Sequence, residues 1–305
     1  MRPLKVGVQL PEVEYDYTWP QLAEMAGVAE EIGLDSIWLG DHLLYRYADA
    51  DRAPRGPFEA WTTLGALAAV TTRVQLGPLV ASLGFHSPVM VAKKAVTIDR
   101  ISNGRFILGI GSGWHEPEYR AYGFPFDQRV SRFAEAFAVI RELFTTGTSD
   151  FRGRFYEIEQ ANLFPKPVQT GGPPLMVGTT GPRMLAITLP HVEMWNAWHA
   201  DYGNNQDGLA KLLATIDRAC EQHHRDPATL LRSVCPLVRM SGGTGRQTAY
   251  GTTGLPLDGT TPTALAEELA AYAELGVAHV QLVLDPITAA SIAELEPTLR
   301  LLEDS

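Results

Sequence analysis

The chain has 305 residues, of which 45% are hydrophobic and 20% charged, and its formal net charge is −10. This acidic balance argues against a nucleic-acid-binding protein, which would show a basic face. No apolar run approaches the ~20 residues that a membrane span needs, and no signal peptide precedes the first apolar run. We therefore expect a cytoplasmic protein of enzyme size that binds neither nucleic acid nor membrane.

In the first half of the chain, short apolar runs alternate with segments of helical periodicity. Thr18 and Gln21 form a capping-box pattern that opens the first predicted helix, and Gly33 closes it. The predicted strands of this half are residues 6–10, 36–40, 74–81 and 106–110. The helices that follow the later strands are expected at residues 58–72, 88–101 and about 127–144.

The second half continues the alternation less regularly. Residues 151–158, turning at Gly153, predict a small hairpin after the fourth helix. The predicted strands of this half are residues 175–178, 193–197, 234–240 and 279–284. The predicted helices are about ten residues after Arg183, then residues 205–223, 262–275 and 289–302. Residues 242–261, rich in Gly and Thr, form a long segment that we interpret as a mobile candidate lid.

This alternation predicts the α/β fold class, with residues 1–305 as a single (β/α)8 TIM barrel that carries the hairpin insertion. A doubly wound open sheet is the alternative. Gly109, Gly111 and Gly113 do not support it, because a dinucleotide fingerprint needs glycines that open a helix in an early strand–helix–strand unit. These glycines lie in the fourth unit, and we predict no helix between them and about Asp127.

Active sites of such barrels lie at the carboxyl ends of the strands. Asp41 and His42 follow the second strand and are the best acid/base candidates, because histidine titrates near neutral pH and aspartate can anchor a hydrogen-bond donor. The other positions at strand ends are Gln9, Ser82, residues 111–115, 179–183 and 195–198, Met240 and Asp285.

We expect structural roles for the remaining histidines and for the cysteines. No pair of histidines has the spacing of a metal site, so we expect no metal. Cys220 and Cys235 fit neither a metal site nor a disulfide framework, and we expect two reduced, buried thiols. The histidines interpreted as structural or rim residues are His86, His191, His199 and His279.

The stretch from Gly178 to Arg183 is a second candidate binding segment. A strand ends there and a helix begins at Pro182, so free backbone N–H groups could face an anion. The alternative is a plain helix cap that uses Thr180.

Three stretches together carry a family resemblance: residues 38–42 (WLGDH), 76–88, and 99–114 (DRISNGRFILGIGSGW). The chain closely resembles the bacterial-luciferase-like family over most of residues 4–200. The resemblance implies a TIM-type barrel oxidoreductase that uses either FMN or the deazaflavin coenzyme F420. Family members commonly dimerise, so a homodimer is expected.

In the F420 branch, the resemblance implies that Asp41 contacts the coenzyme and that His42 is the catalytic acid/base beside the carbon that exchanges hydride. It also implies a non-proline cis peptide, which we expect at Leu79–Val80. The residues implied to contact the coenzyme are Asp41, Leu79, Val80, Ser82, Ser112, Gly113, Gly178, Thr179, Gly181 and Pro182.

One departure from the family bears on the substrate. Sugar-phosphate dehydrogenases of the family place a catalytic glutamate where this chain has Trp114, which argues for a bulkier, less polar substrate than a hexose phosphate. We expect the substrate pocket to include Gln9, Trp114, His115 and Trp195.

The leading interpretation is thus hydride transfer between F420 and an organic small molecule. The alternative is an FMN-dependent monooxygenase that uses O2 and flavin reduced by a partner reductase, which could also supply reduced F420. A third possibility is a barrel that binds cofactor without catalysis.

Overall fold

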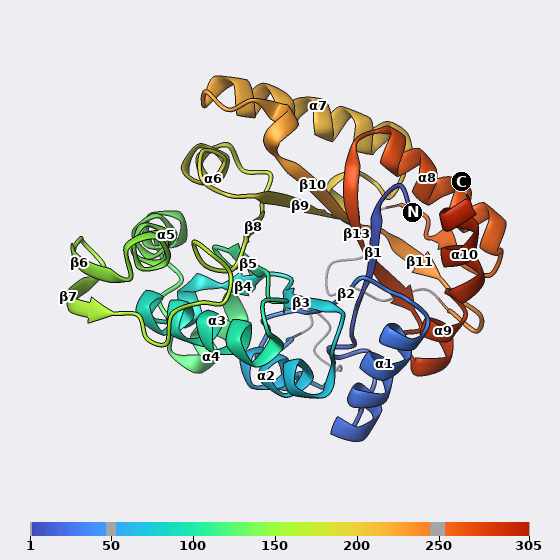
Figure 1. Cartoon of the computed structure of the whole chain (residues 1–305), viewed down its shortest axis with the longest axis horizontal. Helices are drawn as coiled ribbons and strands as arrows, with labels where there is room; N and C mark the ends of the chain where they lie inside the picture. Colours follow the sequence, from blue (N-terminus) through green and yellow to red (C-terminus); the bar gives the residue numbers. More distant parts are fainter. Residues whose placement is uncertain (1, 47–52, 245–253, 305) are drawn as a thin grey trace.

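The centre of the computed structural model is a parallel sheet that closes nearly into a barrel (Figure 1). The structure describes residues 2–46, 53–244 and 254–304. Its sheet runs in the order β3-β2-β1-β13-β10-β9-β8-β5-β4. The strands on this path are β1 (Lys5–Gln9), β2 (Ser36–Leu39), β3 (Gln75–Pro78), β4 (Ala81–Ser82), β5 (Leu108–Gly111), β8 (Leu175–Gly178), β9 (Met194–Trp198), β10 (Leu231–Cys235) and β13 (Val277–Asp285).

The two ends of this path belong to one stretch of chain, which closes the ring. β3 and β4 are separated by Leu79 and Val80 alone. β3 also reaches the segment before β5, because Ile107 N donates to Leu76 O at 2.9 Å. The predicted barrel with eight strand positions is therefore confirmed, with the third position broken into β3 and β4.

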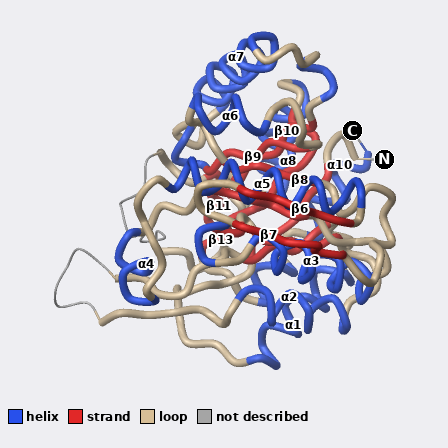
Figure 2. The backbone as a smooth tube through the Cα atoms, turned by 90° about the vertical axis from the view of Figure 1, so that its left-hand side faces the viewer, coloured by secondary structure: helices blue, strands red, loops and turns tan. Residues whose placement is uncertain are grey.

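Helices surround the strands on the outside (Figure 2). The helices are α1 (Trp19–Glu31), α2 (Ala60–Val70), α3 (Pro88–Ser102), α4 (Glu116–Tyr122), α5 (Arg129–Thr146), α6 (Pro182–Thr188), α7 (Gln206–Gln222), α8 (Pro262–Glu274), α9 (Ala289–Ala293) and α10 (Glu296–Asp304). The capping box at Thr18 is present, as predicted. Among the described residues, no helix is both long and apolar enough to cross a membrane.

Helix α4 corrects the expectation that no helix begins before Asp127. Pro117 stands in its first turn, where a missing N–H costs nothing, and Glu116 and Glu118 suit the positive end of the helix dipole. Gly123, at φ 75°, ends the helix in the left-handed conformation. A glycine-rich strand end can thus be followed by a helix after a short loop.

The hairpin lies outside the barrel beside α5 (Figure 1). It pairs β6 (Thr148–Arg152) with β7 (Glu157–Asn162) in antiparallel fashion, so the predicted hairpin is confirmed and is longer than expected. The carboxylate of Glu135 on α5 accepts from the backbone N–H groups of residues 154–156 in its turn.

The seventh strand position and the last helix are also interrupted. Pro236 separates β10 from β11 (Leu237–Arg239), and residues 294–295 separate α9 from α10. β12 (Leu257–Asp258), which lies within the predicted candidate lid, pairs with β11. Residues 245–253 of that segment lie outside the described residues.

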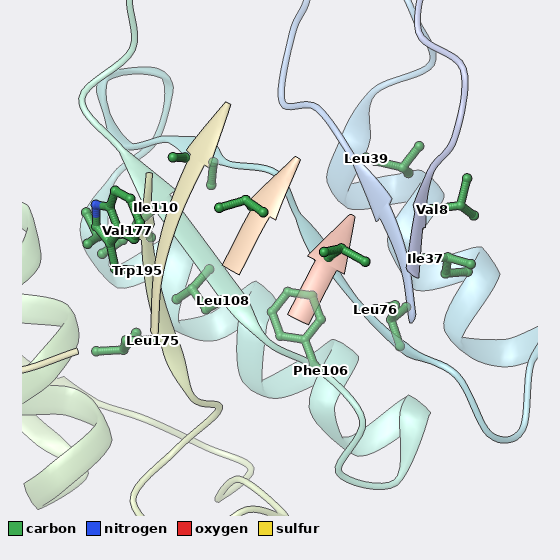
Figure 3. Packing of buried hydrophobic residues seen from close by; sticks show 14 of the residues in the cluster. Val8, Ile37, Leu39, Leu76, Phe106, Leu108, Ile110, Leu175, Val177 and Trp195 are labelled. Carbon is green, nitrogen blue, oxygen red and sulfur yellow. The ribbon is translucent and has the colours of Figure 1, made fainter. Parts of the chain in front are cut away.

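Alternate residues of each strand face two different environments. The outward set packs in one large apolar cluster between the strands and the helices (Figure 3). Trp195 belongs to this set and lies with Ile110 and Val177. Its indole is fully buried, and Nε1 donates to Thr179 O at 2.7 Å. This placement contradicts the prediction that Trp195 lines a substrate pocket, because the neighbouring Met194 is the residue that packs in a separate inner cluster with Trp38.

The inward set includes a buried polar layer in the amino-terminal half of the barrel. Trp38 Nε1 donates to Ser36 Oγ at 2.7 Å, and the same oxygen lies 2.7 Å from His279 Nε2. The contact with Ser36 holds the buried ring through Nε2. His279 therefore has the structural role that we predicted.

Both cysteines are free and buried, as predicted. Cys235 lies farther along the barrel interior and donates to Asn196 Oδ1 at 3.3 Å. Burial raises the pKa of its thiol to about 12, so the group stays protonated and unreactive.

Candidate active site

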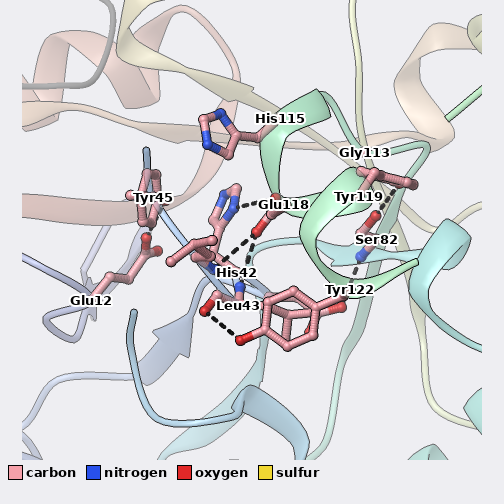
Figure 4. Close-up of polar contacts among 12 residues, drawn as sticks. Glu12, His42, Leu43, Tyr45, Ser82, Gly113, His115, Glu118, Tyr119 and Tyr122 are labelled. Atoms are coloured by element: carbon pink, nitrogen blue, oxygen red, sulfur yellow. Dashed lines mark hydrogen bonds and ion pairs between the residues drawn. The ribbon is translucent and has the colours of Figure 1, made fainter. Parts of the chain in front are cut away.

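His42 follows β2 at the carboxyl end of the barrel and pairs with a carboxylate from α4 (Figure 4). Its Nδ1 lies 2.9 Å from Glu118 Oε1. The second carboxylate oxygen, Oε2, accepts from the backbone N–H groups of Leu43 at 2.9 Å and Leu44 at 3.4 Å. Glu118 is almost fully buried, whereas 15% of the His42 side chain is exposed. The imidazole is thus held at one ring nitrogen and open at its other edge.

Opposing effects act on the charge of His42. Burial lowers its pKa, but the hydrogen bond to Glu118 and the charges of Glu12, Glu118 and Asp41 raise it. The net result is a pKa above the ordinary 6.5. A histidine with this balance keeps its proton to higher pH than a free imidazole and can exchange it with a bound molecule.

Asp41 lies beside His42 but faces a different set of partners. Its Oδ2 accepts from the backbone N–H of Ser82 at 2.9 Å and lies 3.0 Å from His86 Nε2. Its Oδ1 is buried and has no hydrogen-bond partner among the described residues. A buried acceptor of this kind is costly unless a ligand supplies the donor.

Aromatic rings stand around His42. The Tyr45 ring centroid lies 4.6 Å from that of His42, and the Trp114 centroid lies 5.4 Å away at a nearly perpendicular angle. Trp114 is 47% exposed, while His115 is fully buried behind it. Trp114 is therefore accessible beside His42, whereas His115 is closed off from solvent, and the place of both in a substrate pocket stays a prediction.

Glu12, in the loop after β1, supports the opposite side of the same wall. Its carboxylate accepts from Tyr45 Oη at 2.5 Å and from Gln9 Nε2 at 2.5 Å. Gln9 Oε1 is a second buried acceptor without a partner among the described residues. Gln9 is thus joined to Glu12, and its place in a substrate pocket stays a prediction.

Gly113 forms a close approach between the loop after β5 and the end of β4. Its φ is 74°, and a Cβ at this position would lie 2.5 Å from Ser82 Oγ and collide with the Tyr119 hydroxyl. Ser82 Oγ and Tyr119 Oη are 2.6 Å apart, and Tyr119 also donates to Ser112 O at 3.1 Å. The predicted coenzyme residues Ser82, Ser112 and Gly113 are therefore brought together by Tyr119.

The predicted cis peptide is present at Leu79–Val80. Val80 packs over Gly111 and Gly178, where a side chain on either glycine would crowd it. Val80, Gly111 and Gly178 thus form one wall across three neighbouring strand positions.

The segment after β8 contains an internal hydrogen bond next to the start of α6. Gly181 N donates to Thr179 Oγ1 at 3.2 Å, and Gly181 rather than Thr180 is the N-cap of α6. The interpretation of Thr180 as a helix cap is therefore wrong, while the role of Thr179, Gly181 and Pro182 in binding an anion stays a prediction. The described residues contain no group of three or more histidine, cysteine or acidic side chains that could hold a metal ion.

Two functional side chains were not found from the sequence. Glu118 and Tyr119 lie on α4, a helix that we did not expect. Glu118 is 76 residues from His42 in sequence. No local sequence pattern marks this pairing, because it depends on where α4 meets the loop after β2.

Comparison with known proteins places this site in a family. The family model described as luciferase-like monooxygenase matches residues 5–242. The chain therefore belongs to the luciferase-like monooxygenase family, as the resemblance implied.

Two curated relatives differ in what they are named to do. An F420-dependent glucose-6-phosphate dehydrogenase from Amycolatopsis mediterranei is 36% identical over 183 residues, which cover 59% of this chain and 53% of the relative. The pyrimidine monooxygenase RutA from Serratia proteamaculans is 41% identical over 114 residues, which cover 36% of this chain and 31% of the relative. The chain thus spans about half of the first relative and a third of the second.

Solved structures share the whole fold at low identity. An F420-dependent secondary alcohol dehydrogenase in complex with an F420–acetone adduct has a TM-score of 0.81 and 18% identity, with 99% of each chain covered. A riboflavin lyase (RcaE) with modified FMN and riboflavin also has a TM-score of 0.81, at 14% identity, with 99% of this chain and 91% of the lyase covered. These likenesses show the fold.

Proposed function

We propose that the protein is an oxidoreductase that uses F420 to exchange a hydride with an organic small molecule. The observation that carries the proposal is His42, held through Nδ1 by Glu118 at 2.9 Å and open to the barrel mouth at its other edge. Exchange of a hydride with a carbon–oxygen or similar group requires a second group to move the accompanying proton. The F420-dependent dehydrogenase that matches 59% of this chain supports the same choice.

The residues at the mouth fit a ring coenzyme with polar edges. Asp41 Oδ1 and Gln9 Oε1 are buried acceptors that lack donors among the described residues. The wall of Val80, Gly111 and Gly178 offers a flat surface without projecting polar groups. The residues that would hold F420 are Asp41, Leu79, Val80, Ser82, Ser112, Gly113, Gly178, Thr179, Gly181 and Pro182.

When bound, F420 supplies a two-electron hydride carrier. The chain supplies orientation and proton movement. Asp41 would accept a hydrogen bond from the ring system, and His42 would give or take the substrate's proton at Nε2. Trp114 and Tyr45, whose rings both lie next to that of His42, would exclude water from that atom.

Trp114 supports a substrate that is bulkier and less polar than a hexose phosphate. Its indole is nearly half exposed and lies edge-on to His42. An aromatic surface at this place favours apolar or aromatic substrate groups, and it offers no carboxylate for sugar hydroxyls.

The second candidate is a monooxygenase that uses FMN and O2 with flavin from a partner reductase. The 41% identity to RutA over 114 residues favours it. A barrel that binds cofactor without turnover is the third candidate. The homodimer implied by the resemblance is part of the leading proposal and would be measured by sedimentation.

A side-by-side titration tests these candidates. Purified protein is titrated against F420, followed by the coenzyme's fluorescence, and against FMN under the same conditions. The proposal expects tighter binding of F420, and hydride exchange that His42→Ala abolishes while binding persists. Tighter binding of FMN, together with O2 uptake in the presence of reduced flavin, would overturn it. Tight F420 binding without turnover over a broad substrate panel would favour the non-catalytic barrel.

A further inference from the structure

We propose that Glu118 is a positioning residue that fixes which ring nitrogen of His42 meets the substrate. It holds the imidazole by Nδ1, so that Nε2 is the atom left to exchange a proton. The inference rests on the proposed function for the reaction that His42 serves, whereas the pairing itself can be tested without coenzyme.

The hydrogen bonds at Glu118 determine the tautomer. An ionised carboxylate only accepts hydrogen bonds, so the contact of 2.9 Å between Oε1 and Nδ1 requires a proton on Nδ1. The other oxygen accepts from Leu43 N and Leu44 N, which leaves no donor on the carboxylate that could reverse the pairing. Within the part of the chain that the structure describes, His42 Nε2 makes no hydrogen bond.

Helix α4 is braced so that the carboxylate cannot easily turn away. Tyr119, the next residue, ties the helix to Ser82 and Ser112 through its hydroxyl. Tyr122, one turn later, donates to Leu43 O at 3.3 Å (Figure 4). The helix thus contacts the loops after β2, β4 and β5, and it brings Glu118 to the segment that carries His42.

Charged and titratable groups from several elements face His42. Glu118 comes from α4, Glu12 from the loop after β1, and Asp41 from the end of β2. Tyr45 covers one face of the ring, and its hydroxyl is bound to Glu12. His115 is the opposing group, but burial lowers its pKa, and nearby His42 lowers it further. Three carboxylates therefore favour a charged His42, and Glu118 alone among these three contacts the ring by a hydrogen bond.

Replacement of Glu118 by glutamine should disturb both the charge and the tautomer. An amide has one oxygen, and the N–H groups of Leu43 and Leu44 compete for it. The NH2 group is then left facing Nδ1, which can only accept from it, so the His42 proton moves to Nε2. Loss of the carboxylate charge should also lower the His42 pKa.

The experiment is a pH titration of the 15N-labelled full chain, without coenzyme, followed by the ring nitrogen signals of His42. The His42→Ala variant assigns those signals. The compared variants are Glu118→Gln, Glu12→Gln and the matched control Glu116→Gln. Glu116 lies on the same helix, pairs with Arg120 at 2.6 Å and is 43% exposed. In the wild type we expect neutral His42 to carry its proton on Nδ1 and to titrate above pH 6.5. Glu118→Gln should change the tautomer and lower the His42 pKa. Glu12→Gln should lower the pKa less and leave the tautomer unchanged, and Glu116→Gln should change neither.

A Glu118→Gln protein with the wild-type tautomer and titration would overturn the proposal. If that variant fails to fold, the wild type still decides: a neutral His42 with its proton on Nε2, titrating at or below pH 6.5, would contradict the pairing. Failure of F420 to bind would instead sink the proposed function and leave these spectra unchanged, so the two failures are distinguishable. Where turnover is measured, Glu118→Gln should shift the His42 limb of the kcat pH profile to lower pH, which a purely structural role would not do.

Discussion

His42 and His279 occupy opposite ends of the same barrel and have opposite surroundings. His42 stands at the carboxyl ends of the strands, is partly exposed, and pairs with the Glu118 carboxylate. His279 stands in the amino-terminal half, is 2% exposed, and pairs with the neutral hydroxyl of Ser36. Burial lowers the pKa of His279 to about 3, with a small further effect from Lys5, whereas the carboxylates around His42 raise its pKa. The partner, rather than burial alone, decides whether a histidine inside this barrel carries charge.

Under the proposed function, proton transfer belongs to the His42 end of the barrel and stability to the His279 end. A charged, partly open imidazole can move a proton, while a neutral imidazole locked between Ser36 and the core cannot. Substitutions at the two histidines should therefore separate turnover from the free energy of unfolding.

The largest expected effect is on turnover in His42→Ala. Loss of the proton-transfer group should lower kcat by about 10²–10⁴-fold, because general acid–base catalysis contributes that range. The Kd for F420, measured by fluorescence, should change by only a few-fold. His279→Gln is the control, since its amide can still form a hydrogen bond with Ser36, and its kcat should stay close to that of the wild type. A His42→Ala protein with wild-type kcat would contradict the comparison.

The next effect concerns stability. His279→Ala removes a fully packed ring and leaves the Ser36 hydroxyl without this hydrogen-bond partner. We expect a loss of about 2–4 kcal/mol in the free energy of unfolding, measured in urea. His42→Ala should cost less, because its ring is partly exposed and its partner also binds two backbone N–H groups. If both variants lost the same free energy of unfolding, the His42 and His279 ends of the barrel would not differ in their contribution to stability.

The two histidines should also give stability opposite dependences on pH. The folded-state pKa of His279 is depressed to about 3, so the unfolded chain binds a proton below about pH 6.5 that the folded chain does not. Stability is therefore lost as pH falls, by about 3 kcal/mol at pH 4 from this residue. The folded-state pKa of His42 is raised, so its contribution is complete below about pH 6.5 and is lost as pH rises through the folded-state value.

Urea unfolding at several pH values checks both signs. His279→Gln should flatten the acid side of the profile, and Glu118→Gln should flatten the change between neutral and alkaline pH. A His279→Gln profile as steep as that of the wild type between pH 6.5 and 4 would show that other groups cause the acid loss.

The smallest effect is expected at the hydrogen bonds by which Tyr119 on α4 joins Ser82 and Ser112. Tyr119→Phe removes the hydroxyl that joins Ser82 Oγ and Ser112 O, and should cost about 1 kcal/mol of stability. It should also raise the Kd for F420 a few-fold, because Ser82 and Ser112 lose a common anchor. Tyr122→Phe is the matched control, since that hydroxyl makes one longer bond on an exposed side chain. An unchanged Kd in Tyr119→Phe would mean that these hydrogen bonds do not position Ser82 and Ser112.

The sequence was sufficient for the barrel and for the position of its mouth. Alternating apolar runs and helical segments predicted all eight strand positions, and Asp41 and His42 could be placed because they follow a strand directly. The break at Leu79–Val80 came from family resemblance, since no local pattern in residues 74–81 marks it.

The errors have physical causes. Helix α4 has seven residues, too few to show an apolar stripe, and the glycines before it favoured a loop. Without α4, Glu118 could not be assigned to His42, because the pairing depends on where two distant loops meet. Trp195 was misplaced because we considered its position at a strand end but not its side of the strand. Alternation places Met194 inside and Trp195 outside.

A single pH titration of both histidines in the wild-type protein tests most directly whether the two ends of the barrel hold histidines of different charge. The ring nitrogens of His42 and His279 would be followed in the same 15N-labelled sample from pH 9 to pH 4. The structure predicts that His42 carries its proton on Nδ1 when neutral and titrates with a pKa above 6.5, while His279 remains neutral down to pH 4. Two histidines that titrate together near pH 6.5 would contradict the account.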